Sequence, residues 1–385
     1  MDLKVLHVAR SPMSGVWSVI CSLAQWQRQR GYTTGIGIMM SSIWPESYRS
    51  QLRDLERDGI LVFHGSSPNI FGTGAYLWHD LINPVSRWIG RFDASGRGRT
   101  VVHFHNAWLS GAFHPVRPHS VRTCATYHGV AGESELRVQP FRRFLHGVWA
   151  RRLVQCGVKL VSVDQQSPYI AEDLFGVGAS RFCVIPNGVP EPSFGPQGCL
   201  RLRDPSQPFT VGHVGTIDGG KGWRITAEAV SAIHSDGFPI RFVVAGSGPQ
   251  SDQVKEWCGR NASFAKYLGF VSDPVASVFP MIDVLSLPSQ REGLPMAIVE
   301  SLSHGIPILA TSVGGIPDAV TNGYNGFLVD RSKAGVKAGL LSLVRDPELH
   351  REFSTAARAR YEAQFSQEAM GVAYETVYQG GDNGL

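Results

Sequence analysis

Short apolar runs of strand length alternate with helical stretches along this chain, and the alternation occurs twice. In the first half the runs lie at residues 5–8, 34–40, 60–63, 101–105, 121–127, 160–163 and 182–185. In the second half they lie at 210–214, 240–245, 267–270, 284–287, 307–310 and 326–329. Strands separated by helices predict parallel sheets with helices on both faces. The pattern therefore predicts two doubly wound α/β domains.

The two series of strands are separated by residues 190–208, a Pro/Gly-rich interval with little hydrophobic periodicity. This interval is the predicted linker. A chain of 385 residues is also too long for one ordinary core. Because doubly wound sheets bind ligands at the carboxyl ends of their strands, we expect the ligand between the two domains, at those ends of both sheets.

Composition places the protein among ordinary globular chains, with 43% hydrophobic and 18% charged residues. Its six cysteines form no CxxC pair, which argues against a zinc ribbon or a disulfide scaffold and favours reduced thiols. The first residues lack the apolar region of a signal peptide. No apolar run approaches the roughly 20 residues of a membrane-spanning helix. We expect a cytoplasmic protein, soluble or peripheral on the inner face of the membrane.

Two glutamates, Glu292 and Glu300, stand eight positions apart in the segment 289–300. The segment follows a predicted strand, passes a Gly-Leu-Pro turn and continues from Met296 as the first turns of a helix. Backbone N–H groups at a helix start are unpaired and favour anions or hydroxyl oxygens. A carboxylate pair in this position can accept hydrogen bonds from a polyhydroxylated ligand.

The segment 289–300 resembles the Glu-x7-Glu motif of retaining glycosyltransferases of family 4, and the segments 305–311 and 314–318 are also typical of that family. The resemblance implies the GT-B architecture, in which two Rossmann-like doubly wound domains face each other across a cleft. Residues 1–195 would form the acceptor-binding domain and 196–365 the domain that binds the nucleotide-sugar donor. A helix within 366–385 would cross back to the first domain.

The resemblance gives the two carboxylates separate duties. Glu300 would accept hydrogen bonds from the ribose of the nucleotide, and Glu292 would bind the donor sugar near the reacting centre. The backbone amides of Leu294, Met296 and Ala297 would contact sugar hydroxyls and phosphate. Glu292 is therefore a predicted catalytic residue, and the other four are predicted donor-binding residues.

Two loops of the predicted donor site follow the family in part. The family has an Arg followed by Lys-Gly, and these two cations hold the donor diphosphate. Lys221 matches the Lys, but Thr216 occupies the usual Arg position, and Arg224 is a candidate substitute for the missing charge. In the first half the family has Gly-Gly facing the diphosphate, where only Gly15 is present.

Three further strand ends resemble family segments. Gly246 belongs to a Gly-x-Gly-Pro loop that allows close approach of a ligand to the backbone. Val271 and Asp273 match the segment that contacts the base, although an ordinary strand end with an Asp helix cap also explains them. His128 ends the strand 121–127 and matches a family histidine near the donor sugar and phosphate, which makes it the third predicted catalytic residue besides Glu292 and Lys221.

Residues after the strand 101–105 form a predicted acceptor-side loop with His105, Asn106 and Trp108. His103 and His105 share one face of the strand. The five histidines between residues 103 and 128 (His103, His105, His114, His119 and His128) lack regularly spaced acidic or Cys ligands, so packing or substrate binding is preferred to a metal site. The resemblance implies a metal-independent enzyme, and we expect no cofactor.

The stretch 137–153 combines five arginines with apolar residues at helical spacing. Two interpretations stay open: a basic amphipathic helix lying on an anionic membrane, or a helix with its apolar face in the core and solvated arginines outside. Residues 1–200 carry a net charge of +7 and residues 201–385 one of −3, which keeps the membrane contact in consideration. No recognition module for nucleic acid is present.

These features predict a retaining glycosyltransferase that moves a sugar from a UDP- or GDP-linked donor to a hydroxyl acceptor. The acceptor class implied by the resemblance is a glycan or lipid-linked saccharide in polysaccharide or glycoconjugate synthesis. Two alternatives stay open. One is another GT-B enzyme, such as a sugar-nucleotide epimerase or a phosphorylase. The other is a non-catalytic protein that binds sugar nucleotides.

Overall fold

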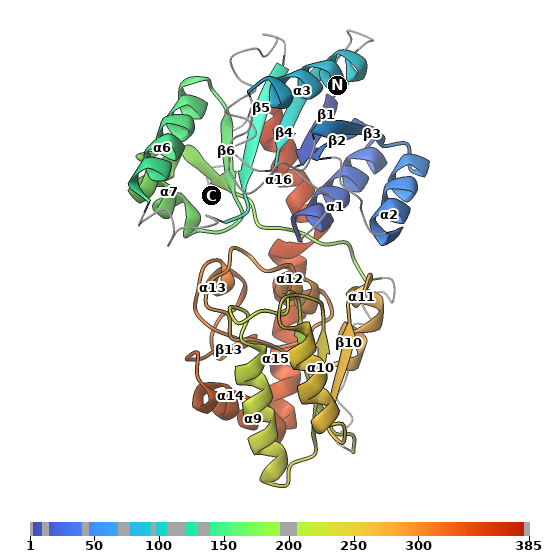
Figure 1. The fold of residues 1–385 in the computed structure, drawn as a ribbon, viewed down its shortest axis with the longest axis vertical. Coiled ribbons are helices and arrows are strands. Elements are labelled where there is room, and N and C mark those ends of the chain that lie inside the picture. Colours follow the sequence, from blue (N-terminus) through green and yellow to red (C-terminus); the bar gives the residue numbers. More distant parts are fainter. Residues whose placement is uncertain are drawn as a thin grey trace. The chain divides into compact units, whose positions relative to one another are not determined.

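The computed structural model describes residues 3–9, 15–40, 46–67, 78–93, 98–105, 121–129, 139–192 and 206–380. The chain divides into two compact units (Figure 1). The N-terminal unit comprises Met1–Gly188 and Gln367–Leu385, and the C-terminal unit comprises Val189–Ser366. The division thus falls at 188/189, slightly before the expected 195/196. Residues 193–205 of the predicted linker lie outside the described part.

The N-terminal unit contains a parallel sheet with the strand order β3-β2-β1-β4-β5-β6-β7. The strands are β1 (Leu3–Ala9), β2 (Thr33–Met40), β3 (Leu61–Ser67), β4 (Arg99–Phe104), β5 (Val121–Tyr127), β6 (Lys159–Ser162) and β7 (Phe182–Val184). Its helices are α1 (Gly15–Gln29), α2 (Glu46–Arg57), α3 (Trp78–Phe92), α6 (Pro140–Gln155), α7 (Ser167–Phe175) and α16 (Gln367–Gln379). All predicted strands of the first half are present.

The two faces of this sheet differ in chemistry. One face presents Leu6, Val102 and Phe104 to a buried apolar cluster that includes residues of α3, α6 and α7. Side chains alternate along a strand, so the neighbouring positions His7 and His103 lie on the opposite face. That face carries buried polar groups, and α1 and α16 supply hydrogen-bond partners for them.

Helix α16 packs against α1 and reaches across the polar face of the sheet (Figure 1). Its close approach depends on Gly371, because a Cβ atom there would lie 2.3 Å from the ring of Trp26. The Tyr378 hydroxyl lies 2.7 Å from His103 Nδ1, and the Tyr374 hydroxyl lies 3.0 Å from Thr126 Oγ1. The helix therefore belongs to the core of the N-terminal unit.

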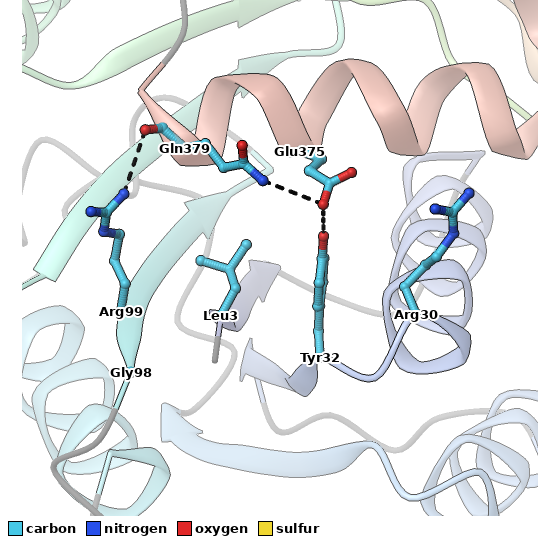
Figure 2. Close-up of a pocket in the computed structure, with 7 residues that line it drawn as sticks. All are labelled: Leu3, Arg30, Tyr32, Gly98, Arg99, Glu375 and Gln379. Carbon is cyan, nitrogen blue, oxygen red and sulfur yellow. Dashed lines mark hydrogen bonds between the residues drawn. The ribbon is translucent and has the colours of Figure 1, made fainter. Parts of the chain in front are cut away.

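A cavity of about 420 Å³ lies beside the end of α16 (Figure 2). Figure 2 shows the Tyr32 hydroxyl and the Gln379 amide donating to the Glu375 carboxylate, and Arg99 donating to the Gln379 carbonyl. Leu3 and Arg99 begin β1 and β4, so the cavity lies at the amino-terminal ends of the strands. Doubly wound sheets bind their ligands at the opposite ends, and the cavity is therefore not the candidate site.

The C-terminal unit contains a second parallel sheet, with the order β10-β9-β8-β11-β12-β13. The strands are β8 (Phe209–Val214), β9 (Ile240–Ala245), β10 (Ala265–Gly269), β11 (Val284–Leu287), β12 (Ile308–Ala310) and β13 (Gly326–Leu328). Its helices are α9 (Trp223–Ser235), α10 (Ser251–Arg260), α11 (Pro274–Ser277), α12 (Met296–Ser303), α13 (Ile316–Ala319), α14 (Lys333–Arg345) and α15 (Pro347–Arg360). All predicted strands of the second half are present.

The sequence prediction of two Rossmann-like doubly wound units is confirmed. Each unit has its own buried apolar core, built on the faces of its sheet. Among the described helices, none is long and apolar enough to cross a membrane.

Candidate active site

Both sheets reverse their strand order at one point, and several of the predicted site residues follow the strands that meet there. The reversal lies between β1 and β4 in the N-terminal unit and between β8 and β11 in the C-terminal unit. Loops diverge from the carboxyl ends of the strands at such a switch point and leave room for a ligand. In the C-terminal unit these loops carry Lys221, after β8, and Glu292, after β11.

Lys221 and Glu292 form an ion pair at this switch point. The Lys221 Nζ atom lies 2.7 Å and 2.6 Å from the two Glu292 carboxylate oxygens. The Ser289 hydroxyl donates to the same carboxylate over 2.6 Å. The Glu292 side chain is 6% exposed and that of Lys221 is 27% exposed. The structure thus brings two of the three predicted catalytic residues together, with the cation on the more open side.

Glycines allow the loops to approach each other backbone to backbone. A Cβ at Gly314 would lie 1.9 Å from the Glu292 carbonyl oxygen, and one at Gly246 would lie 1.8 Å from that of Gly215. Gly314 and Gly246 also have φ angles of +56° and +138°, which side chains disfavour. The predicted Gly246 loop therefore serves first to pack against the loop after β8.

An arginine that the sequence analysis missed holds the Lys221 loop in place. Arg331 follows β13 and donates to the Pro288 carbonyl over 3.1 Å and to the Gly219 carbonyl over 2.6 Å. It thereby ties the ends of β8 and β11 to a third loop. A single Arg after a strand has no distinctive spacing, so only the tertiary structure reveals this role.

The start of α12 presents backbone N–H groups that have no acceptor within the helix. Met296 and Ala297 are its first two residues, so their N–H groups have no acceptor in a preceding helical turn. Leu294 lies just before the helix and is buried. These amides are available to an anion or to hydroxyl oxygens at the carboxyl end of the sheet.

Glu300 lies one turn further along α12 and differs from Glu292 in its surroundings. Its carboxyl makes no hydrogen bond among the described residues. Burial raises its pKa to about 7, and the Asp273 carboxylate adds to the rise. A partly desolvated carboxyl without a partner is suited to receive hydrogen bonds from ligand hydroxyls. The two glutamates therefore have different surroundings in the fold.

Two predicted donor-binding residues, Asp273 and Arg224, make structural contacts of their own. Asp273 caps α11 by accepting a hydrogen bond from the Ala276 amide over 3.0 Å. Val271 lies half-buried in the same strand-to-helix connection. Arg224 donates to Gln253 over 2.7 Å and stacks on the Trp223 ring, with its guanidinium carbon 5.0 Å from the ring centre. Arg224 is thus bound to α10 and does not join Lys221. Thr216 is exposed.

The remaining predicted residues belong to the N-terminal unit. Gly15 begins α1, directly after residues 10–14, which the structure does not describe. His105 and His128 follow β4 and β5, and their ring nitrogens Nδ1 and Nε2 lie 3.2 Å apart. Burial lowers the pKa of His128 to about 4, so its ring is neutral near neutral pH. The predicted Asn106 and Trp108 lie outside the described residues.

His7 and Gln27 also belong to this site, although the sequence analysis did not select them. His7, His103 and His105 are buried, and their ligand atoms lie within 4.8 Å of one another. All six ring nitrogens of these three residues already have hydrogen-bond partners. The cluster is therefore satisfied as a hydrogen-bond network. A polar residue inside an apolar strand was the available signal for His7.

Helix α6 exposes apolar side chains. Phe141 and Phe144 are 72% and 61% exposed, and Val148 is also exposed. These residues stand three and four positions apart and therefore form one stripe on the helix. Arg143 and Arg151 are exposed as well. The interpretation that this stretch buries its apolar face in the core is thus wrong for the stripe, although Ala150 and Leu153 elsewhere on the helix are buried.

Two family models match the chain. The model described as Glycosyltransferase Family 4 matches residues 13–191, and the model described as Glycosyl transferases group 1 matches residues 208–346. The chain belongs to the family 4 glycosyltransferases. The resemblance inferred from the sequence is confirmed.

Curated relatives of this family 4 protein match over part of their length. The N-acetyl-alpha-D-glucosaminyl L-malate synthase of Bacillus anthracis is 35% identical over 36% of this chain and 37% of that protein. The D-inositol 3-phosphate glycosyltransferase of Acidothermus cellulolyticus is 29% identical over 67% of this chain and 62% of that protein. The chain therefore spans less than two thirds of the length of these relatives.

Solved structures match over nearly the full chain. Anabaena HepE in complex with UDP is 18% identical, with a TM-score of 0.74, over 98% of this chain and 100% of that chain. WaaG, a glycosyltransferase involved in lipopolysaccharide biosynthesis, is 15% identical, with a TM-score of 0.66, over 98% and 100%. At such low sequence identity the structural similarity shows only the fold, which is GT-B.

The ion pair predicts a measurable cost when its cation is removed. In Lys221→Met the Glu292 carboxylate stays buried without its partner. We expect a loss of about 2 kcal/mol in the free energy of unfolding, less than the 3–5 kcal/mol of a fully buried pair because Lys221 is partly exposed. The double variant Lys221→Met/Glu292→Gln should recover most of the loss, since no unpaired charge then remains. Urea unfolding measures the free energy of unfolding of the unmodified protein, the single variant and the double variant.

The matched control is Lys337→Met, which breaks a surface pair with Asp236 at 2.7 Å. This variant should lose less than about 1 kcal/mol. Equal losses in Lys221→Met and Lys337→Met would contradict the assignment of a buried, mutually dependent pair at the switch point.

Proposed function

We propose that this protein is a retaining glycosyltransferase that transfers a sugar from a nucleotide diphosphate sugar to a hydroxyl acceptor. The observation that carries the proposal is the switch point of the C-terminal unit. There a Lys221–Glu292 ion pair, the free amides of α12 and the unpaired Glu300 carboxyl all lie at the carboxyl end of one sheet. This set offers a cation, N–H donors and a hydroxyl acceptor, which are the groups that a sugar nucleotide requires.

The donor is assigned to the C-terminal unit. Glu300 accepts hydrogen bonds from the ribose hydroxyls, because its carboxyl has no hydrogen-bond partner among the described residues. The amides of Met296 and Ala297 and the Lys221 ammonium bind the diphosphate, which favours a helix N-terminus and a cation. UDP is bound in the similar HepE structure, which supports a UDP-linked donor here; a GDP-linked donor is the other candidate.

The catalytic work is the stabilisation of negative charge on the departing diphosphate. Lys221 performs it, and Glu292 holds the Lys221 ammonium while it contacts the transferred sugar. Because Glu292 is engaged by both Lys221 and Ser289, it is better placed for these duties than for attack on the sugar. This supports retention by same-face attack, without a covalent glycosyl-enzyme. We propose in addition that the reaction needs no metal ion.

The acceptor is assigned to the N-terminal unit, with His105 and His128 among the residues that face it or the donor sugar. The acceptor class that we propose is a glycan or a lipid-linked saccharide. The name of one relative, a capsular polysaccharide biosynthesis glycosyltransferase, supports this class, whereas the N-acetyl-alpha-D-glucosaminyl L-malate synthase shows that other acceptors occur among the relatives. We place the reaction in the cytoplasm, at the membrane surface.

One observation favours a second candidate, a non-catalytic protein that binds sugar nucleotides. Thr216 replaces the family's arginine, and Arg224, held by Gln253, does not restore the charge. Such a protein would bind the donor and show neither transfer nor slow hydrolysis. A thermal-shift screen with UDP, GDP, ADP and their sugar conjugates identifies the donor for either candidate, because a bound ligand raises the melting temperature.

Turnover separates the two candidates. With the donor found in that screen, the release of nucleoside diphosphate should fall about 10²–10³-fold in Lys221→Met, since one stabilising group for the leaving phosphate is lost. The release of nucleoside diphosphate should also fall sharply in Glu292→Gln, while the unfolding curve of this variant remains that of a folded protein. Lys337→Met should keep full activity. Unchanged turnover in Lys221→Met and Glu292→Gln would refute the assignment.

The raised pKa of Glu300 predicts a pH dependence of nucleotide affinity. Ribose hydroxyls donate to the ionised carboxylate, so binding lowers a pKa that is about 7 in the free protein. The affinity for UDP should therefore be greatest above this pH and fall below it, by up to about tenfold per pH unit. Calorimetric titration of UDP over this range measures the effect.

Two comparisons isolate Glu300 from the titration of the diphosphate itself. The 2′,3′-dideoxy analogue of UDP carries the same phosphates but no ribose hydroxyls, and the Glu300→Gln variant cannot ionise at this position. Each should remove the additional pH dependence. An identical pH profile for UDP and its dideoxy analogue on the unmodified protein would exclude Glu300 as the ribose anchor.

We also propose that α6 docks the protein on an anionic membrane. Its exposed stripe of Phe141, Phe144 and Val148 can enter the interface, and the exposed Arg152, four positions after Val148 and therefore on the same side of the helix, can contact lipid phosphates. The net charge of +7 over residues 1–200 has the sign that such a surface requires.

The double variant Phe141→Ser/Phe144→Ser should bind anionic vesicles at least about tenfold more weakly, since burial of one Phe contributes about 1.5–3 kcal/mol. Cosedimentation with phosphatidylglycerol vesicles measures this. Leu61→Ser is the matched control, because Leu61 is an exposed apolar residue of the same unit on β3. Equal binding by the double variant and the control would contradict the proposal.

A further inference from the structure

Four side chains form a continuous hydrogen-bonded line through the N-terminal unit. Gln27 Oε1 lies 2.9 Å from His7 Nε2, His7 Nδ1 lies 2.9 Å from His105 Nε2, and His105 Nδ1 lies 3.2 Å from His128 Nε2. The line starts on α1 and crosses the ends of β1, β4 and β5, which are neighbours in the sheet. Its last member is the predicted catalytic histidine.

The histidines in this line are neutral. Gln27 and His7 are fully buried, and His105 is 5% exposed. Burial lowers the pKa of His7 and His128 to about 4 and that of His105 well below its usual value. The groups facing them from α16, β4 and β5 are Tyr378, Tyr374, His103 and Thr126, none of which carries a formal charge near neutral pH.

A neutral imidazole has one N–H donor and one acceptor nitrogen, so one end of the line determines the direction of every bond. The Gln27 oxygen can only accept, and His7 therefore donates from Nε2 and accepts at Nδ1. His105 then donates from Nε2 and accepts at Nδ1. His128 in turn donates from Nε2, which leaves its Nδ1 without a proton.

The outer nitrogen of the line has no partner. His128 Nδ1 is buried and makes no hydrogen bond among the described residues. A buried acceptor of this kind is normally satisfied by a donor from another group, such as a ligand.

We propose that Gln27 and the two inner histidines are positioning residues that hold His128 as its Nε2–H tautomer, so that Nδ1 accepts a hydrogen bond from a hydroxyl of the transferred sugar. The sugar rests on the function proposed for this protein, whereas the tautomer does not. His128 Nδ1 therefore accepts a hydrogen bond from a sugar hydroxyl and cannot donate one to phosphate.

Nitrogen-15 NMR of protein labelled at its histidines tests the tautomer without any substrate. The His128 signals are identified by their loss in His128→Gln. The Nδ1 shift of His128 should be that of a nitrogen without a proton, and the Nε2 shift that of a protonated nitrogen. A protonated Nδ1 would overturn the proposal, and the shifts themselves are measured on the unmodified protein.

A variant of the first residue tests the line. Gln27→Met keeps the side-chain length but removes the accepting oxygen, so the His128 Nδ1 and Nε2 shifts should move towards each other as both tautomers become populated. Gln25→Met, two residues away on α1, removes an exposed hydrogen bond to Asp58 and should leave the His128 shifts unchanged. Unchanged shifts in folded Gln27→Met would refute the positioning role.

UDP and UDP-glucose then separate this inference from the function. Addition of UDP-glucose should shift the His128 Nδ1 signal in the direction of an accepted hydrogen bond, and UDP alone should not. If UDP-glucose binds without this shift, the sugar-hydroxyl role is refuted. If neither compound binds, the assignment of a UDP-linked donor fails, while the substrate-free spectra still decide the tautomer.

Discussion

Parallel pairing of β1 with β4 and of β8 with β11 is the constraint on which the remaining features depend. Each pairing forces the chain to leave the sheet in opposite directions at its carboxyl end, and the loops that diverge there leave room for a ligand. Lys221 and Glu292 meet because their loops follow β8 and β11. His105 and His128 meet because β4 and β5 are adjacent. The backbone hydrogen bonds between paired strands thus determine which side chains meet at the site.

On the polar face of the N-terminal sheet, strand pairing buries histidine side chains, and other elements supply hydrogen-bond partners for the polar groups there. Buried imidazoles lose their hydration, and each must find partners inside the protein. α1 supplies Gln27, and α16, more than 200 residues later in the sequence, supplies Tyr374 and Tyr378. The C-terminal segment of the chain is therefore required by the first sheet, both for packing through Gly371 and for satisfying its histidines.

The sequence predicted the fold well, because strand periodicity and glycine-rich strand ends are local signals. The Glu292–Glu300 pair and the start of α12 were also predictable, since they lie within one short segment. His7, Gln27 and Arg331 were not predicted. His7 and Gln27 act through partners on other elements, and Arg331 acts through backbone carbonyls that any sequence provides. The compensating role of Arg224 was conceivable from its spacing, but Gln253 holds its guanidinium elsewhere.

The sequence by itself determined two doubly wound units, the family, and the separate positions of Lys221, Glu292 and Glu300. These follow from periodicity, motif spacing and residue type, which are properties of neighbouring residues. Only the tertiary structure decided that Lys221 is paired with Glu292 and that His128 ends a line of buried imidazoles. It also decided that Glu300 has no hydrogen-bond partner among the described residues and that burial raises its pKa to about 7. Protonation and pairing depend on desolvation and on distances between elements far apart in the chain, and no local pattern records them.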